Sequence, residues 1–299
     1  MEQGDDHDDP SRRGERGGRD DGVDYDTAGE RYDRTRGRTA GTAAYGGHVR
    51  RELADAPAGP VLDLGSGTGA WSRALATWSG RDVVGLEPSA GMRGMAATNR
   101  RRDSPRPAAM GATRGPATTS AAGDGGVVAA GEATAGRVHL VGGRADGVPL
   151  RDGVAGAAWL STVIHHVGDL DACANELRRV LAPGAPVLIR SAFPGRYDGI
   201  GLVRFFPATR RVLDRFPSVD AVRAAFEGAG FRFAGIQRVD EPPVGYRRWR
   251  ERLPSQRLAD TILVGLTDDE FAAGLRALDA AIAAGRDPEA VGLDLLVLH

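Results

Sequence analysis

Residues 61–76, VLDLGSGTGAWSRALA, constrain the fold of this chain more than any other stretch. A short apolar run ends in three glycines, Gly65, Gly67 and Gly69, and a helical pattern follows. Side chains at these glycines would block a ligand that approaches the backbone. The stretch therefore predicts a buried strand, a turn that holds a ligand against bare backbone, and a helix.

Apolar runs alternate with helical patterns along most of the chain. We expect seven strands, over residues 60–65, 82–88, 137–143, 155–161, 186–193, 232–239 and 293–298. We expect helices over residues 70–78, 89–97, 169–181, 218–231 and 268–284, with Ser89, Asp169 or Asp171, and Ser218 as amino-terminal caps. This alternation predicts an α/β fold with a doubly wound, mostly parallel seven-stranded sheet. Ligands of such sheets lie outside the carboxyl ends of the strands.

Several segments fall outside this pattern. Residues 1–24 are charged and glycine-rich with almost nothing apolar, so we expect a disordered tail before a single domain at 25–299. Residues 97–136 are poor in large apolar side chains and predict a flexible surface insertion. Residues 194–217 and 241–287 exceed a minimal sheet, and we expect helical lid insertions there. These segments contain four aromatic residues that could line a pocket or form a core within the lid: Phe205, Phe206, Tyr246 and Trp249. We favour the core.

Composition narrows the function classes. The formal net charge is -1, so nothing global points to nucleic acid or a membrane surface. No apolar run approaches the roughly 20 residues of a membrane span. The single cysteine, Cys173, rules out internal disulfides and fits a reducing compartment. We expect a cytoplasmic monomer or homodimer that acts on a small molecule and has no nucleic-acid or membrane partner.

The glycine turn satisfies two ligand-binding patterns. Residues 65–70 fit the G-x-G-x-x-G/A fingerprint of dinucleotide sites and also the G-x-G-x-G turn of S-adenosylmethionine (SAM) methyltransferases. Both families place an acidic residue for the ribose at the next strand end, where this chain has Glu87. Asp63, two residues before Gly65, favours a ligand with an ammonium group, since it would repel a pyrophosphate.

Three further segments resemble those of class I SAM-dependent methyltransferases. LEPSAGM at 86–92 is similar to their second motif, and GRADGVPLRDG at 143–153 is similar to the block after their third strand. Residues 157–189 resemble their fourth strand, the next helix and the "RVLKPGG" segment. With the glycine turn, these segments keep the family's order and spacing. The chain therefore resembles class I SAM-dependent methyltransferases, in particular the UbiE-like small-molecule subgroup.

Two outer segments add to the resemblance. ERYDRTRGR at 30–38 is similar to the "YDxxR" element that precedes the domain in this subgroup. LTDDEFAAGLRAL, followed by a terminal strand, looks like relatives that insert lid helices between the last two strands. The resemblance implies a Rossmann-like fold, S-adenosyl-L-methionine as cofactor, and methyl transfer to a small-molecule acceptor.

The resemblance also implies roles for individual residues. Tyr32 and Arg36 would cover the cofactor or touch the substrate. Arg144 stands where the family usually has an acidic residue for the adenine amino group, so we carry over only the backbone of Ala145, with Asp146 as an alternative. The implied cofactor-binding residues are Asp63, Gly65, Ser66, Gly67, Thr68, Gly69, Glu87, Pro88, Met92, Ala145 and Ser161.

His165 and His166 follow the fourth strand, at the edge toward which the methyl group of SAM should point. A neutral imidazole there could take a proton from a hydroxyl acceptor. The alternative is that the pair serves positioning and packing. We keep both as candidate catalytic residues, His166 slightly ahead. No third metal ligand of suitable spacing accompanies them, so we expect no metal.

Three rival functions stay open at this point. An NAD-dependent oxidoreductase shares the glycine turn, and Arg144 leaves room for a SAM-binding regulator without turnover. RNA methylation is disfavoured by the balanced charge and by the absence of a dedicated RNA-binding module. The arginine-only basic residues and the divergent lid segments suggest, by association, an enzyme of secondary metabolism.

Overall fold

The computed structural model describes residues 25, 42–103 and 136–299. The predictions for the tail at 1–24, for Tyr32 and Arg36, and for residues 104–135 of the insertion lie outside the described residues. No described helix has the length and apolar character that a membrane span requires.

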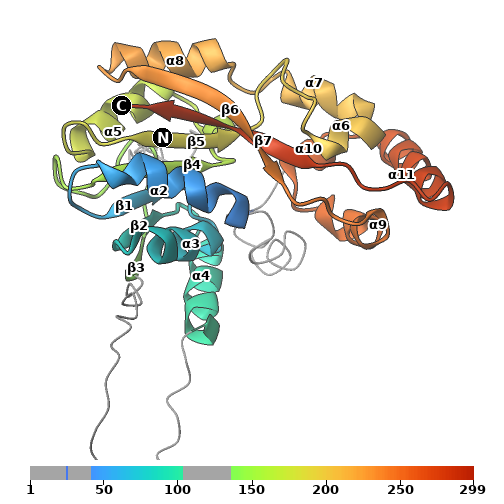
Figure 1. The fold of residues 1–299 in the computed structure, drawn as a ribbon, viewed down its shortest axis with the longest axis horizontal. Coiled ribbons are helices and arrows are strands. Elements are labelled where there is room, and N and C mark those ends of the chain that lie inside the picture. The colour runs from blue at the N-terminus through green and yellow to red at the C-terminus, as the bar shows by residue number, and fades with distance from the viewer. Residues whose placement is uncertain (1–24, 26–41, 104–135) are drawn as a thin grey trace, which may run out of the picture.

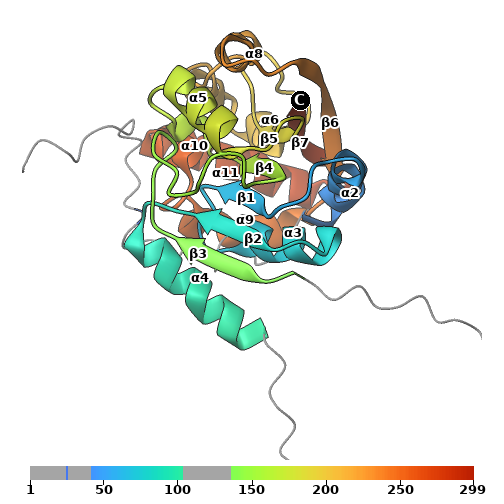
Figure 2. The same cartoon turned by 90° about the vertical axis from the view of Figure 1, so that its left-hand side faces the viewer.

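One seven-stranded sheet organises the chain, with strand order β3-β2-β1-β4-β5-β7-β6 (Figures 1 and 2). β7 runs antiparallel to both of its neighbours, β5 and β6, and the other pairs are parallel. The expected fold class is therefore confirmed: a doubly wound, mostly parallel, Rossmann-like sheet. The strands are β1 (Val61–Leu64), β2 (Val83–Leu86), β3 (Val138–Val141), β4 (Ala157–Ser161), β5 (Val187–Ser191), β6 (Phe233–Glu241) and β7 (Val291–Leu298).

Helices cover both faces of the sheet and its carboxyl end. Three predicted caps are confirmed, because side chains of Ser89, Asp169 and Ser218 accept hydrogen bonds from the backbone three residues later. The described helices are η2 (Thr42–Tyr45), α2 (Gly46–Ala54), α3 (Ala70–Ser79), α4 (Ala90–Asp103), η3 (Ile164–His166), α5 (Leu170–Val180), α6 (Gly201–Phe205), η4 (Pro207–Thr209), α7 (Arg210–Leu213), α8 (Val219–Gly228), α9 (Tyr246–Gln256), α10 (Thr261–Val264) and α11 (Asp268–Ala283).

Two cores lie on opposite faces of the sheet, because successive strand residues point to opposite sides. Leu160 packs into the core under α5 and α8, with Leu177 and Phe226. Trp159 packs into the other core, under α2 and α3, with Tyr45. Figure 2 shows α5 on one side of the sheet and α2 and α3 on the other.

A third core belongs to the lid. α6, η4 and α7 follow β5, whereas α9, α10 and α11 lie between β6 and β7. They gather beyond the carboxyl ends of the parallel strands, on the right of Figure 1. Phe206, Leu253, Phe271 and Leu278 form this core, which contains no residue of the sheet. The core role predicted for Phe205, Phe206 and Tyr246 is confirmed, and Trp249 packs against the same cluster. Phe205, Tyr246 and Trp249 also line a cavity, so the alternative role applies to them as well.

Two expectations about the helices were wrong or incomplete. The helix after β2 continues to Asp103 rather than ending at residue 97. Arg100 fastens its last turns to the sheet, because the Arg100 guanidinium donates to the Val138 carbonyl oxygen at 3.1 Å. η2 and α2, which the sequence reading did not predict, are held by fully buried Tyr45 and Val49.

The packing of α11 on Phe206 gives a stability prediction. A Cβ at Gly274 would lie 2.0 Å from the Phe206 ring, so Gly274→Ala should destabilise the lid by about 1–3 kcal/mol through overpacking. Gly94→Ala in α4 is the matched control, because a Cβ there meets nothing within 4 Å. Because Gly94 is exposed in a helix, Gly94→Ala should raise the free energy of unfolding by about 0.5–1 kcal/mol. Urea unfolding of both variants measures whether the two changes in stability have opposite signs. A Gly274→Ala variant as stable as the parent would contradict the close contact between Gly274 and Phe206.

Candidate functional site

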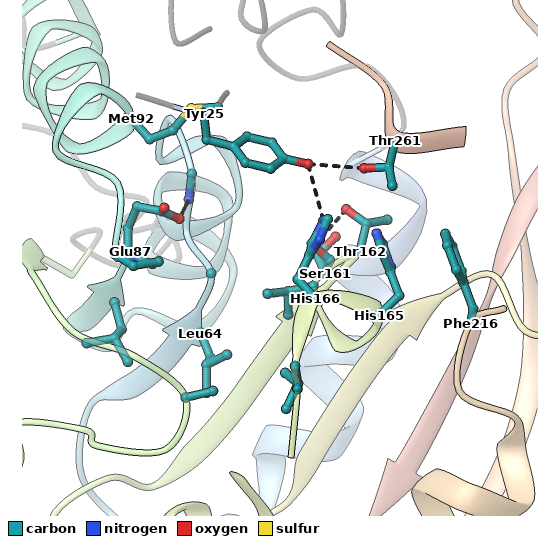
Figure 3. Close-up of a pocket in the computed structure, with 18 of the residues that line it drawn as sticks. Tyr25, Leu64, Glu87, Met92, Ser161, Thr162, His165, His166, Phe216 and Thr261 are labelled. Carbon is teal, nitrogen blue, oxygen red and sulfur yellow. Dashed lines mark hydrogen bonds between the residues drawn. The ribbon is translucent and has the colours of Figure 1, made fainter. Parts of the chain in front are cut away.

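A cavity of about 470 Å³ opens outside the carboxyl ends of the parallel strands. Its wall includes the glycine turn after β1, the end of β2, and the loops after β3 and β4 (Figure 3). Tyr25 and residues of the lid close the other side. β1 lies between β2 and β4, so the strand order reverses beside the cavity, where open α/β sheets bind ligands.

The glycine turn presents bare backbone to this cavity. Gly65, Gly67 and Gly69 have φ values of 72°, 52° and 77°, which side-chain-bearing residues rarely adopt. A Cβ at Gly65 would lie 2.4 Å from Val163. A Cβ at Gly67 would meet nothing within 4 Å, and Gly67 lines the cavity. Gly67 is therefore the position at which a side chain would occupy ligand space.

Glu87 joins the end of β2 to the glycine turn. Its carboxylate accepts hydrogen bonds from the Gly67 amide at 2.9 Å and the Ser89 amide at 3.0 Å. Burial raises the pKa of Glu87, and these two backbone bonds oppose the shift. Glu87 lines the cavity, and a carboxylate with two bonds keeps further lone pairs for a ligand's hydroxyls.

Asp63 lies behind the turn rather than in the cavity wall. It is 1% exposed, and the Ser72 hydroxyl donates to its carboxylate at 2.6 Å. Burial raises the pKa of Asp63 to about 7, the Ser72 bond opposes this shift, and the charge of Glu87 adds to it. The second buried carboxylate of the site thus faces inward, toward the helix that follows the turn.

The structure brings most of the predicted site residues together. Asp63, Ser66, Thr68 and Gly69 are not among the residues that line the cavity. Nine of the predicted residues do line it: Gly65, Gly67, Glu87, Pro88, Met92, Ala145, Ser161, His165 and His166.

Arg144 and Asp146 border the cavity as a pair. The Arg144 Nε lies 3.2 Å from the Asp146 carboxylate, and both side chains are about half exposed. Asp146, the alternative partner predicted for the adenine amino group, is therefore already paired with Arg144.

The loop after β4 begins with a backbone conformation unusual for its residue type. Thr162 has φ 53°, which is rare for a β-branched side chain. The Thr162 hydroxyl donates to the Ser161 carbonyl at 2.7 Å. The chain then turns through η3, so that His165 and His166 both line the cavity. Strained residues of this kind cluster at binding and catalytic sites.

The two histidines have different surroundings (Figure 3). His165 stacks on Phe216 of the lid, with ring centroids 4.0 Å apart and planes 1° apart. His166 Nε2 lies 3.3 Å from the Tyr25 hydroxyl, which is also 3.1 Å from the Thr261 hydroxyl. His165 thus packs against the lid, whereas His166 belongs to a hydrogen-bonded chain across the cavity.

Tyr25 is the main residue that sequence reasoning missed. Its hydroxyl reaches His166 and Thr261, and its carbonyl accepts a hydrogen bond from Ser89 at 3.1 Å. It therefore connects the end of β2, the loop after β4 and the lid. The only signal was an aromatic residue at the first position after the charged tail.

The described residues show no metal-binding constellation. Nowhere in the ranges 42–103 and 136–299, or at Tyr25, do three His, Cys, Asp or Glu side chains gather closely enough to hold an ion. Cys173 is buried, and burial raises its pKa to about 12, so the thiol stays protonated.

Comparisons with known proteins agree with the geometry. Residues 62–189 match the family model described as a methyltransferase domain. A protein described as a methyltransferase of an antibiotic biosynthesis pathway in Anabaena variabilis has the same fold, with 18% identity, a TM-score of 0.55, and coverage of 86% of this chain and 97% of that one. No curated protein sequence matches.

Two further solved structures are similar. Phosphoethanolamine N-methyltransferase 2 of Haemonchus contortus, in complex with S-adenosyl-L-methionine, is 16% identical with a TM-score of 0.53, covering 91% of this chain and 56% of that one. A protein described as a sarcosine dimethylglycine methyltransferase of Galdieria sulphuraria is 16% identical with a TM-score of 0.51, covering 86% and 85%. Residues 62–189 are therefore similar to a methyltransferase domain, and the chain shares the fold of these solved structures.

The position of Asp63 gives a pH prediction. Its pKa is about 7 in the folded state and near 4 in the unfolded chain, so its contribution to stability is complete below pH 4 and is lost as pH rises through 7. Asp63→Asn removes this loss. The melting temperature of ligand-free Asp63→Asn, relative to the parent, should therefore rise between pH 5 and pH 8.

The exposed variant Asp55→Asn is the control, and its difference from the parent should stay constant over the same range. A constant difference for Asp63→Asn as well would show that Asp63 is ionised in the folded protein at pH 5.

Proposed function

We propose that this protein is a SAM-dependent methyltransferase with S-adenosyl-L-methionine as its cofactor. It transfers the methyl group to a small-molecule acceptor that lies between the loop after β4 and the lid. One observation carries the proposal: a single cavity joins the glycine turn to the lid. Gly67 and Glu87 line one end, and His165, His166 and Phe216 line the other. A cofactor and an acceptor could therefore meet inside one enclosure.

The chemistry that the cofactor supplies is a sulfonium-activated methyl group: the acceptor's lone pair bonds to the methyl carbon while the carbon–sulfur bond breaks and its electron pair goes to sulfur. The protein's part is to align the acceptor, to exclude water and to accept the acceptor's proton where it has one. The geometry of the cavity supports each of these tasks.

The cofactor half fits such a ligand. The open space at Gly67 leaves room for it against the backbone, and the Glu87 carboxylate can accept bonds from ribose hydroxyls. Met92, only 2% exposed, offers an apolar surface for the adenine. In this proposal Pro88, Ala145 and Ser161 complete the wall, and Ser66, Thr68 and Gly69 shape the turn.

Asp63 supports this half through its charge. Ionised Asp63 beneath the turn attracts a ligand that carries an ammonium and a sulfonium group. Such a ligand also stabilises the ionised carboxylate, whose pKa burial raises to about 7 in the ligand-free protein. The cofactor-binding role predicted for Asp63 is therefore proposed to act through its charge beneath the turn.

In the acceptor half, His166 is the better candidate to hold or take a proton. Its Nε2 lies 3.3 Å from the Tyr25 hydroxyl at the cavity wall. The hydroxyl or amine of a substrate that enters beside this pair would find a hydrogen-bond donor and a hydrogen-bond acceptor side by side. His165, stacked on Phe216, would orient the acceptor by packing.

The wider context extends the proposal. We place the enzyme in the UbiE-like small-molecule subgroup and in secondary metabolism, on its sequence segments and its divergent lid. A cytoplasmic location and a monomeric or homodimeric state rest on composition. Size-exclusion chromatography with light scattering measures the oligomeric state.

The cofactor half is tested by a matched pair of glycine variants. Gly67→Ala and Gly153→Ala both place a side chain at positive φ, 52° and 65°, and both have open space for a Cβ. Each should lose about 1–2 kcal/mol of stability. Only Gly67→Ala should also weaken S-adenosylhomocysteine binding, by at least tenfold in calorimetry, because its methyl group enters the cavity.

Equal affinities in the two variants would show that the ligand does not lie against Gly67. NADH titrated into the parent is the second arm, since the glycine turn also fits dinucleotides. Heat from NADH and none from S-adenosylhomocysteine would overturn the assignment.

The acceptor half is tested by turnover of labelled SAM with a panel of phenols, quinones and acids. Tyr25→Phe keeps the ring and removes the hydroxyl that lies between His166 and Thr261. It should lower kcat/KM for the acceptor at least tenfold and leave S-adenosylhomocysteine affinity unchanged. His166→Gln should lower kcat similarly, whereas unchanged kcat in both variants contradicts the role of this pair.

A further inference from the structure

A second cavity, of about 260 Å³, adjoins the first on the lid side of the sheet. It lies between α6, α9 and the ends of β6 and β7, with Arg190 of β5 in its wall. Ile200, Leu202 and Leu293 line both cavities. The two spaces are therefore neighbours that share three apolar side chains in their walls.

The wall of this second cavity is rich in aromatic side chains. Phe205 makes edge contacts with Tyr246, at a centroid distance of 5.1 Å, and with Trp249, at 5.7 Å. Val244 also lines the cavity and is 38% exposed, one of two exposed large hydrophobic residues in the described part of the chain. Concave apolar surfaces of this kind are typical binding sites for organic molecules.

The charged groups in the wall are already neutralised. Arg190 pairs with Glu241 at 2.5 Å, and Arg204 pairs with Glu289 at 2.5 Å. The Arg190 guanidinium also lies 5.0 Å from the centroid of the Tyr45 ring. The cavity thus offers two ion pairs and an apolar surface, which suits a neutral apolar group better than an ion.

We propose that the second cavity takes the apolar arm, aliphatic or aromatic, of the methyl acceptor. This inference rests on the proposed function, in which the acceptor's nucleophile lies beside His166 in the first cavity. Ile200, Leu202 and Leu293 face both spaces, so an arm that passes them stays against apolar side chains throughout. The acceptor is then amphipathic: a polar reacting end and an arm that extends toward Trp249.

A neutral fluorescent probe, N-phenyl-1-naphthylamine, tests the second cavity in protein saturated with S-adenosylhomocysteine. Val244→Trp places a large ring at the cavity wall, and Val291→Phe fills the cavity from β7; neither residue lines the first cavity. Both variants should bind the probe at least tenfold more weakly than the parent. Leu258→Trp is the matched control, since Leu258 is the other exposed large hydrophobic residue and lines neither cavity, and it should bind as the parent does.

Straight-chain alcohols from butanol to octanol, competing with the probe, give a second readout. Each added methylene should strengthen competition about fourfold in the parent, and less in Val244→Trp. Parent-like binding in both filled variants, or no probe binding by the parent, overturns the second cavity as an arm site. Calorimetry with S-adenosylhomocysteine separates the two proposals. If the parent does not bind S-adenosylhomocysteine, the proposed function is wrong. If the parent binds it but the probe assay fails, only the proposal of the apolar arm is wrong.

Discussion

The hydrogen bond from the Gly67 amide to the Glu87 carboxylate is the interaction on which the site depends. β1 and β2 are in register, with Leu64 opposite Leu86, so the turn and Glu87 leave the sheet at the same level. The turn needs positive φ at Gly67 to expose its backbone, and Glu87 holds it in that shape. The Glu87 carboxylate tolerates burial because two backbone amides satisfy it. In the proposed function, folding and ligand binding therefore use the same carboxylate.

A second carboxylate makes the ligand-free site electrostatically unfavourable. Asp63 is buried beneath the turn, and the charge of Glu87 helps to raise its pKa to about 7. Two neighbouring buried acids would gain from a cationic ligand nearby. Functional sites commonly keep such unfavourable arrangements of charge at a cost in folding stability. The arrangement favours a sulfonium cofactor over an anionic dinucleotide, on the same grounds that the sequence suggested.

Local signals predicted the frame of this molecule, and long-range contacts decided the rest. Apolar runs, capping residues and turn glycines act within a few positions, so the seven strands and the caps Ser89, Asp169 and Ser218 could be read from the sequence. Tyr25 could not, because its partners His166 and Thr261 lie far along the chain. The placement of Asp63 away from the cavity also depends on Ser72, a contact that the motif alone does not specify.

The lid has a core of its own, separate from the two cores of the sheet. Its core, around Phe206, Phe271 and Leu278, contains no strand residue, so substitutions there leave both faces of the sheet intact. The family match ends at residue 189, inside β5 and before the first lid helix. In the proposed function, the residues that hold the cofactor satisfy one constant ligand, whereas most lid residues after 189 face the acceptor. On this proposal, acceptor specificity depends mainly on the segments that the family model does not cover.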